Sequence, residues 1–227
     1  MATNGTLALV GGDEWTEGCT FDATLLAASG GPDVLVLPTA AAYQHPERVV
    51  LRAAEWFGPI GGQVEGLMVV DRASADDPGM AATVAGARFI YLAGGSPLHL
   101  RAALKKSAVF EALRRAFAAG AVVAGAGAGA MVLTDPMVDP RGGALTLGLG
   151  LVDNLTVFPH FGDEHDDAHG QKLERTVAMA PAALPVVALP ARTALIRDGG
   201  AWRSEGAGTP VVFVGGAQTE GLVALKG

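Results

Sequence analysis

Three alternating glycines in the middle of the chain occupy the marked positions of a catalytic turn. Gly125, Gly127 and Gly129 follow the apolar run 122–124. In a G-x-S-x-G turn, a strained strand-to-helix corner projects a serine hydroxyl, and the next backbone N–H faces the developing oxyanion. Gly127 fits such a backbone but has no side chain to attack with. The pattern predicts a nucleophile elbow without its serine, with an ordinary tight turn as the alternative.

The same stretch also matches the G-x-G-x-x-A fingerprint of dinucleotide-binding proteins, through Gly125, Gly127 and Ala130. That fingerprint normally follows the first strand and needs an acidic residue about 20 positions later, at the end of the next strand. Here the turn-rich stretch 135–150 follows instead, and we expect it to form a surface loop. We therefore assign no cofactor.

Other reactive side chains have structural explanations. Ser96 precedes Pro97, which is the arrangement of a helix N-cap followed by a first-turn proline. Cys19 has no histidine nearby in the sequence, so a buried structural thiol is expected. His165 and His169 have the spacing of two metal ligands on one helix turn, but the consecutive acids around them are typical of a solvated loop. We assign no metal site.

Short apolar runs that end in small or polar residues alternate with helix-like segments, which predicts an α/β fold with a mostly parallel sheet between two helical layers. Parallel strands carry their ligands at their carboxyl ends, so the loops 11–13, 38–39, 94–96 and 125–129 should share one edge. The expected strands are 6–10, 34–37, 64–70, 89–92 and 122–124.

Helices are expected where apolar residues recur at three- and four-residue spacing. These segments are 21–28, 46–57, 78–85, 97–106 and 109–119. Later in the chain we expect a strand at 155–158, a helix around 171–179, and β-rich segments at 186–189, 193–196 and 211–214.

Composition limits the class of protein. The chain has 227 residues, half of them hydrophobic and only 17% charged, which suits one core-rich domain over residues 1–227 and excludes a disordered chain. The net charge of −7 would repel nucleic acid and anionic lipid, so neither is an expected partner. The uncharged run 116–133 contains four glycines, which favours a helix end, a buried strand and a tight turn over a membrane span.

Cellular location and assembly follow from weaker features. The N-terminal residues lack a basic region followed by a long apolar one, so no export signal is expected. A single cysteine excludes an internal disulfide framework and fits a reducing compartment, which predicts a cytoplasmic protein. The apolar segment 211–214 suits either the core or an interface, so a homodimer stays open.

In the order and spacing of its motifs, the chain resembles peptidase E and cyanophycinase, which are serine peptidases on a class I glutamine amidotransferase-like fold. The matching segments are LVGGDEW (9–15), VLPT (36–39), IYLAGGSPLHL (90–100), GAGAGA (125–130), VDP (138–140), GLGLV (148–152) and FPHF (158–161). The resemblance implies a three-layer α/β/α domain and a serine-type peptidase activity.

The resemblance also implies site residues. The catalytic serine falls on Gly127, the general-base histidine on His160, and the acidic partner on Asp135, with Asp139 competing for that role. The backbone N–H groups of Gly95 and Ala128 match the oxyanion-binding positions, beside Ser96.

The resemblance breaks at a second place besides Gly127. Family members carry an acidic pair before Thr-Ala, whereas this chain has Pro-Ala-Arg at 190–192. Two departures predict a catalytically silent or repurposed homologue that binds a small peptide or an acidic amino-acid derivative. The alternative is an active dipeptidase or β-aspartyl peptide hydrolase, either because Gly127 replaces a natural serine in this chain or because another group, such as His160 with water, does the chemistry.

Overall fold

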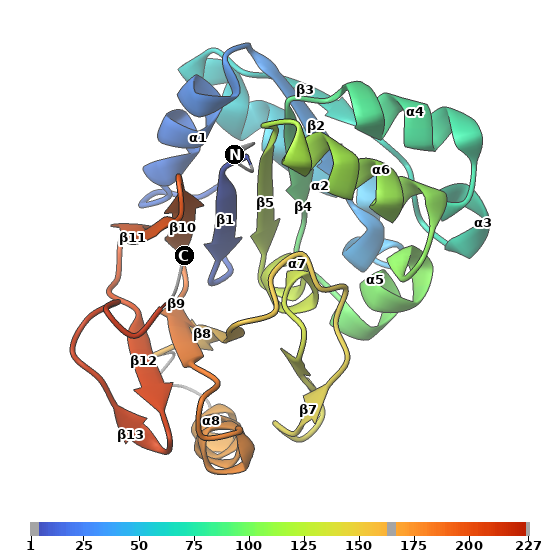
Figure 1. The fold of residues 1–227 in the computed structure, drawn as a ribbon. Coiled ribbons are helices and arrows are strands. Elements are labelled where there is room, and N and C mark those ends of the chain that lie inside the picture. Colours follow the sequence, from blue (N-terminus) through green and yellow to red (C-terminus); the bar gives the residue numbers. More distant parts are fainter. Residues whose placement is uncertain (1–4, 163–166, 226–227) are drawn as a thin grey trace.

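The computed structural model describes residues 5–162 and 167–225. Within these residues the larger sheet has seven strands, in the order β11-β10-β1-β5-β4-β2-β3 (Figure 1). The strands β1 to β5 pair in parallel, whereas β10 and β11 are antiparallel. Their bounds are β1 Leu7–Val10, β2 Asp33–Leu37, β3 Gln63–Gly66, β4 Phe89–Leu92, β5 Val122–Ala126, β10 Thr193–Asp198 and β11 Ala201–Gly206.

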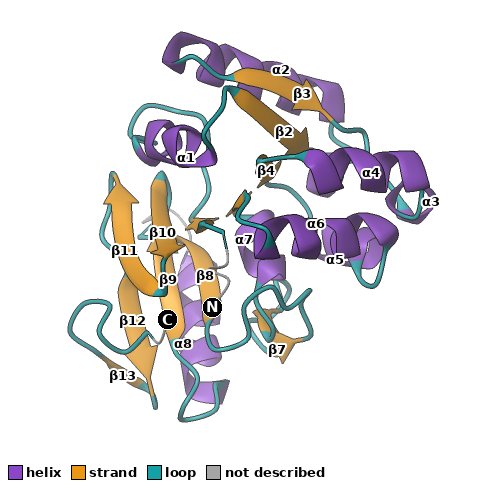
Figure 2. Ribbon diagram, turned by 45° about the horizontal axis from the view of Figure 1, so that its top comes forward, coloured by secondary structure: helices purple, strands orange, loops and turns teal. Residues whose placement is uncertain are grey.

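Helices cover both faces of this sheet, because side chains alternate along each strand. Ala8 and Val10 of β1 lie in the apolar cluster beneath α1 and α2. Leu7 and Leu9 lie in the opposite cluster, with residues of α4, α5, α6 and α7. The two helical layers flank the sheet in Figure 2, which confirms the predicted three-layer α/β/α fold. The helix bounds are α1 Phe21–Ser29, α2 Pro46–Phe57, α4 Pro78–Gly86, α5 Pro97–Leu104, α6 Ala108–Ala118 and α7 Ala128–Leu133.

The last third of the chain builds a second sheet, which is four-stranded among the described residues. Its order is β13-β12-β9-β8, with β8 and β9 parallel. The helix α8 contacts β9. The bounds are β8 Thr156–Phe161, α8 Asp167–Met179, β9 Val186–Pro190, β12 Val211–Val214 and β13 Ala217–Gln218. The predicted segment 193–196 instead joins the main sheet as β10, because it pairs with β1.

The segments 64–75 and 135–150 differ from the sequence-based expectation. The strand expected over 64–70 ends at Gly66, because the N–H of Val69 turns back to the carbonyl of Leu67. A short helix, α3 (Arg72–Ala75), follows and is capped by the Asp71 side chain. The stretch 135–150 is more than a surface loop, because it contains a small hairpin of β6 (Met137–Val138) and β7 (Leu145–Thr146) whose first strand is buried.

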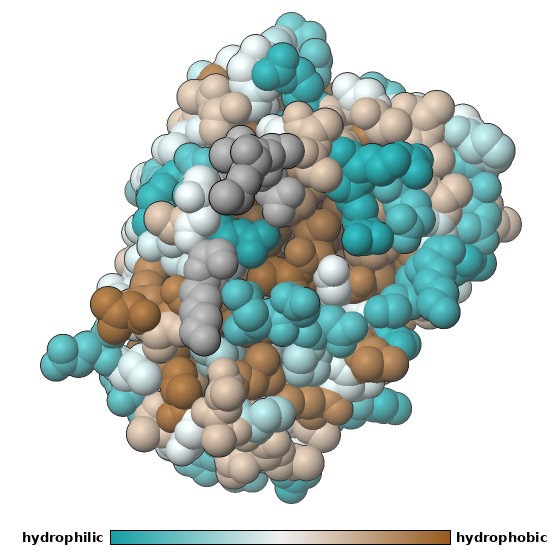
Figure 3. Space-filling view, in the orientation of Figure 1, coloured by the Kyte–Doolittle hydropathy of each residue, from teal (hydrophilic) through white to brown (hydrophobic). Residues whose placement is uncertain are grey.

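The uncharged run 116–133 forms the three expected pieces: the end of α6, the buried strand β5, and α7 after a tight turn. Across the described residues, no helix combines the length and apolar character that a membrane crossing needs. Figure 3 shows one face of the surface, where apolar atoms line a hollow near the middle and hydrophilic groups lie on both sides of it.

Candidate functional site

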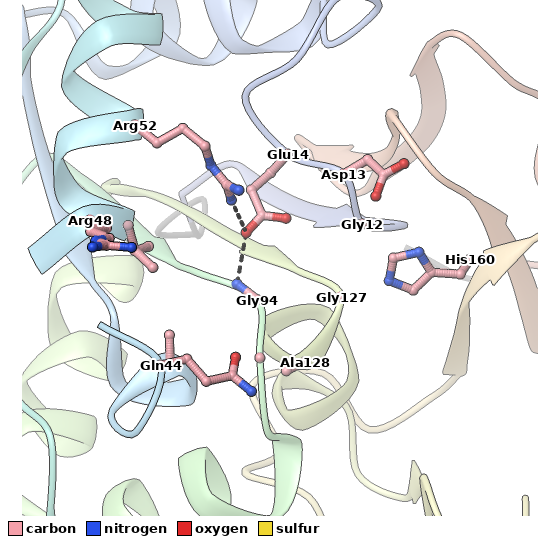
Figure 4. Close-up of a pocket in the computed structure, with 13 residues that line it drawn as sticks. Gly12, Asp13, Glu14, Gln44, Arg48, Arg52, Gly94, Gly127, Ala128 and His160 are labelled. Carbon is pink, nitrogen blue, oxygen red and sulfur yellow. Dashed lines mark hydrogen bonds and ion pairs between the residues drawn. The ribbon is translucent and has the colours of Figure 1, made fainter. Parts of the chain in front are cut away.

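A cleft of about 480 Å³ opens at the carboxyl ends of β1, β4 and β5 (Figure 4). This volume is within the range of small-ligand sites. Three of the four loops predicted to share an edge supply residues to the cleft, and the loop after β2 supplies Ala41 and Gln44 from just beyond 38–39. The lining residues are Gly12, Asp13, Glu14, Ala41, Gln44, Arg48, Val49, Arg52, Gly94, Gly95, Gly127, Ala128 and His160.

The turn between β5 and α7 has the backbone of an elbow. Gly127 has φ +49° and ψ −103°, and its N–H donates to the Val10 carbonyl over 2.9 Å. The two flanking glycines are required by close packing. A Cβ on Gly125 would lie 2.6 Å from the Gly129 carbonyl carbon, and one on Gly129 would lie 2.4 Å from the Leu92 carbonyl oxygen. Backbone atoms cannot swing aside, so both positions exclude a side chain.

The middle glycine differs from its neighbours, because there is space around it. A Cβ on Gly127 would lie 3.6 Å from His160 Nε2 and 4.0 Å from Gly12 Cα, which are ordinary contact distances. Only the positive φ disfavours a side chain at this position. The position assigned to the nucleophile therefore faces the imidazole of His160, as it would in a serine hydrolase.

His160 is held against the first loop of the chain. It lies in β8 with φ +56°, and its N–H donates to the Gly11 carbonyl over 2.8 Å. A Cβ on Gly12 would lie 2.1 Å from the ring carbon Cε1 of His160. Only glycine at position 12 leaves room for the ring at this place, beside Gly127 (Figure 4). The predicted positions 127 and 160 are thus brought together.

The two backbone donors assigned to an oxyanion site also line the cleft. Among the hydrogen bonds of the described residues, none uses the N–H of Gly95 or Ala128. Gly95 has φ +138° and packs so closely on Ala40 that a Cβ would lie 2.4 Å from the Ala40 carbonyl oxygen. Ser96 caps α5, since its Oγ accepts from the His99 N–H over 3.3 Å. The N-cap interpretation of Ser96 is confirmed.

The structure does not bring Asp135 to the cleft. Its Oδ1 accepts from the Gly148 N–H over 3.2 Å, and its Oδ2 lies 3.7 Å from Lys105 Nζ. Asp139 comes closer, because it lines a second cavity together with His160. However, its Oδ2 lies 2.5 Å from Arg141 Nη2, and this guanidinium lowers the pKa of the Asp139 carboxyl. The described residues show no bond from either acid to His160, so the acidic partner stays a prediction.

Opposite the elbow, charged side chains form a wall that the sequence interpretation missed. Glu14 is buried, and its Oε1 accepts from the Gly94 N–H over 2.9 Å and lies 3.6 Å from Arg52 Nη2. The Arg52 guanidinium also lies over the Trp15 ring, 5.6 Å from its centroid. Arg48, one turn earlier on α2, is exposed at the cleft. The sequence offered one signal for this wall: two arginines four residues apart, and so on one face of the helix that follows a predicted site loop.

The remaining candidates lie outside this arrangement. Cys19 is buried and donates its Sγ–H to the Asp13 carbonyl over 3.5 Å, and burial raises the pKa of the thiol, as expected for a structural cysteine. His169 Nε2 bonds the Pro159 carbonyl over 2.9 Å, whereas His165 lies outside the described residues. No three His, Cys, Asp or Glu side chains of the described chain are grouped as metal ligands.

Arg192, at the second departure from the family pattern, is exposed, and its N–H donates to the Gly12 carbonyl over 2.8 Å.

A second, smaller cavity of about 180 Å³ lies on the other side of the elbow. It shares four residues with the main cleft, namely Gly95, Gly127, Ala128 and His160. The elbow therefore stands between two spaces, and a group bound across Gly127 reaches both.

Comparison with known proteins adds an independent line of evidence. The chain is 28% identical over 166 residues to cyanophycinases of Synechococcus elongatus and Thermosynechococcus vestitus, which covers 68% of this chain and 52% of each relative. It thus spans about half the length of these curated relatives.

Solved structures agree with the sequence relatives. A crystal structure of a peptidase from an acI-B1 actinobacterium superposes with a TM-score of 0.83 at 25% identity, over 96% of this chain and 94% of that one. A protein of Listeria monocytogenes EGD-e assigned to peptidase E superposes with a TM-score of 0.70 at 16% identity, over 90% and 100% of the two chains, which shows the shared fold. The model of peptidase family S51 matches residues 7–204, and the chain therefore belongs to that family.

Proposed function

We propose that this family S51 protein binds a small peptide or an acidic amino-acid derivative in its main cleft and does not carry out serine-type hydrolysis. The observation that carries the proposal is Gly127, which takes the nucleophile position and faces His160 Nε2 without a hydroxyl. A general base with no hydroxyl to deprotonate cannot form an acyl-enzyme. The relatives named as peptidases and cyanophycinases support a hydrolase ancestry for the scaffold.

The charges of the cleft support an acidic, zwitterionic ligand. Arg48 has no acidic partner among the described residues, so its guanidinium is free to pair with a ligand carboxylate. Asp13 lies on the same cleft with an exposed carboxylate, which suits an α-ammonium group. The unused N–H groups of Gly95 and Ala128 suit a carbonyl oxygen at the elbow. A short peptide with an acidic first residue satisfies all three requirements.

The proposal is tested by restoring the hydroxyl. We compare the unmodified protein with Gly127→Ser on Asp-containing dipeptides and β-aspartyl peptides. We expect turnover only from Gly127→Ser, because its Oγ would attack the carbonyl while His160 accepts the proton and later donates it to the leaving amine. Gly127→Ala controls for the added Cβ, and Gly127→Ser with His160→Gln controls for the base.

Other outcomes have definite meanings. Turnover by the unmodified protein, lost in His160→Gln, would overturn the proposal in favour of a hydrolase in which His160 activates water. If neither protein hydrolyses these peptides, the missing hydroxyl alone does not explain the lack of activity. Measurements of ligand binding then test the rest of the proposal. We expect calorimetry to show that Arg48→Gln weakens Asp-Gly binding about tenfold, as loss of one charge-assisted bond predicts. Arg115→Gln, an exposed site on α6, is the matched control and should leave the affinity unchanged.

A further inference from the structure

The smaller cavity differs from the main cleft in its walls. Its lining includes six apolar residues: Pro97, Met131, Val138, Pro140, Phe158 and Pro159. Met131, Val138 and Phe158 are 6%, 2% and 3% exposed and belong to one apolar cluster with α8 and β9, so this wall is fixed by core packing. A space with such walls takes an apolar group, because burying that group removes its surface from water.

The size of the cavity limits that group. A cavity of ~150 Å³ lined by apolar side chains is large enough for benzene. At about 180 Å³, the smaller cavity accommodates a side chain the size of leucine or phenylalanine.

Among the polar side chains that line the cavity, Lys172 is available to a ligand. Asp139 forms an ion pair with Arg141, and His169 Nε2 is hydrogen-bonded to the Pro159 carbonyl. Lys172, on α8, also lines the cavity and has no acidic partner among the described residues. Its half-buried position beside apolar walls suits an ammonium that meets a ligand carboxylate.

We propose that the smaller cavity is a subsite for an apolar C-terminal residue of the ligand, with Lys172 pairing with that residue's free carboxylate. This inference rests on the proposed function, because it places the acidic first residue in the main cleft. The peptide bond then crosses the four shared residues at the elbow, where the N–H groups of Gly95 and Ala128 face its carbonyl oxygen. The ligand is a dipeptide of an acidic residue followed by a leucine- or phenylalanine-sized residue.

The test uses calorimetry on the unmodified protein with three ligands: Asp-Gly, Asp-Leu and Asp-leucinamide. We expect Asp-Leu to bind about tenfold to a hundredfold more tightly than Asp-Gly, because it buries four more carbon atoms. We expect Asp-leucinamide to bind several-fold more weakly than Asp-Leu. In Lys172→Gln the acid and the amide should bind equally, whereas Arg175→Gln, on the same helix but outside the cavity, should keep the difference.

The outcomes separate the two proposals. Equal binding of Asp-Gly and Asp-Leu, with both affinities weakened by Arg48→Gln, would overturn the subsite while the proposed function stands. An acid-amide difference that survives Lys172→Gln would overturn the role of Lys172. Binding of Ser-Leu as tight as that of Asp-Leu would support the subsite and contradict the acidic specificity of the main cleft. If no dipeptide binds, both proposals fail.

Discussion

The two walls of the main cleft are built in different ways. The elbow wall consists of Gly12, Gly127 and His160, and its shape comes from backbone contacts. The wall of Glu14 and α2 consists of charged side chains held by one another and by the Gly94 N–H. The elbow can therefore lack a side chain at position 127 and keep its backbone conformation. The α2 wall, in contrast, owes its shape and its charge to the side chains that form it.

The α2 wall also has a distinctive support behind it. Trp56 of α2 donates its Nε1–H over 2.9 Å to Oδ2 of Asp22, a fully buried residue in the first turn of α1. The other oxygen of Asp22 has no hydrogen-bond partner among the described residues. Burial raises the pKa of Asp22 to about 8, although the bond from Trp56 opposes that shift. Within the described chain, no buried carboxyl group of this kind lies behind the elbow wall.

The largest predicted effect is a pH dependence of stability that comes from this support. The unfolded chain releases the Asp22 proton near pH 4, whereas the folded chain keeps it up to about pH 8. The free energy of unfolding should therefore fall as pH rises through that window, by an amount on the order of 5 kcal/mol at ~1.4 kcal/mol per pKa unit. Urea unfolding across the window measures it.

Matched variants show whether Asp22 is the cause. Asp22→Asn should flatten the profile, because the amide does not titrate and its oxygen can still accept from Trp56. Asp33→Asn, at an exposed position, should keep the dependence. An unchanged slope in Asp22→Asn would contradict the assigned support.

The second prediction concerns the elbow wall. Gly129→Ala should destabilise the protein by about 3 kcal/mol or more, since its Cβ meets the Leu92 carbonyl oxygen and neither backbone can yield. Gly127→Ala should cost only about 1–2 kcal/mol, from its positive φ alone. Chemical denaturation of both variants measures the difference. A larger loss in Gly127→Ala than in Gly129→Ala would break the argument that packing requires glycine only at the flanking positions.

The smallest effect is expected at Glu14, where the α2 wall meets the loop after β4. Glu14→Ala removes the acceptor of the Gly94 N–H and should cost about 1–2 kcal/mol. Glu14→Gln keeps an acceptor and should cost less than Glu14→Ala. Glu17→Ala, exposed in the same loop, is the control. Equal melting temperatures for Glu14→Ala and Glu17→Ala would show that this bond adds nothing.

The sequence was sufficient for the elements that rest on local patterns. Short apolar runs bounded by glycine or proline marked the parallel strands, and α2 begins and ends where its periodicity indicated. The strand β11 escaped prediction because this edge strand carries the charged side chains of Arg203 and Glu205, which pair with each other, so its pattern is that of a polar loop.

The candidate site could be predicted where backbone shape decides it. The alternating glycines located the elbow, and the Pro-His-Phe motif located His160 beside it. The charged wall could not be predicted, because Arg48 and Arg52 have the spacing of an ordinary solvated helix face until the fold places α2 against Glu14. Asp135 failed to reach the site for a similar reason, since Lys105 and the Gly148 N–H, distant in sequence, hold its carboxylate.

The position of β1 between β5 and β10 bears on how the protein is made. Leu7 pairs with Val123 on one side and with Arg197 on the other. A ribosome adds about 5–20 residues per second, so β1 waits roughly 10–40 s for its second neighbour after it is synthesised. Its four residues are all apolar and fully buried in the finished fold. Until β10 is synthesised, one edge of this apolar strand lacks its native partner, and unpaired apolar strand edges favour aggregation.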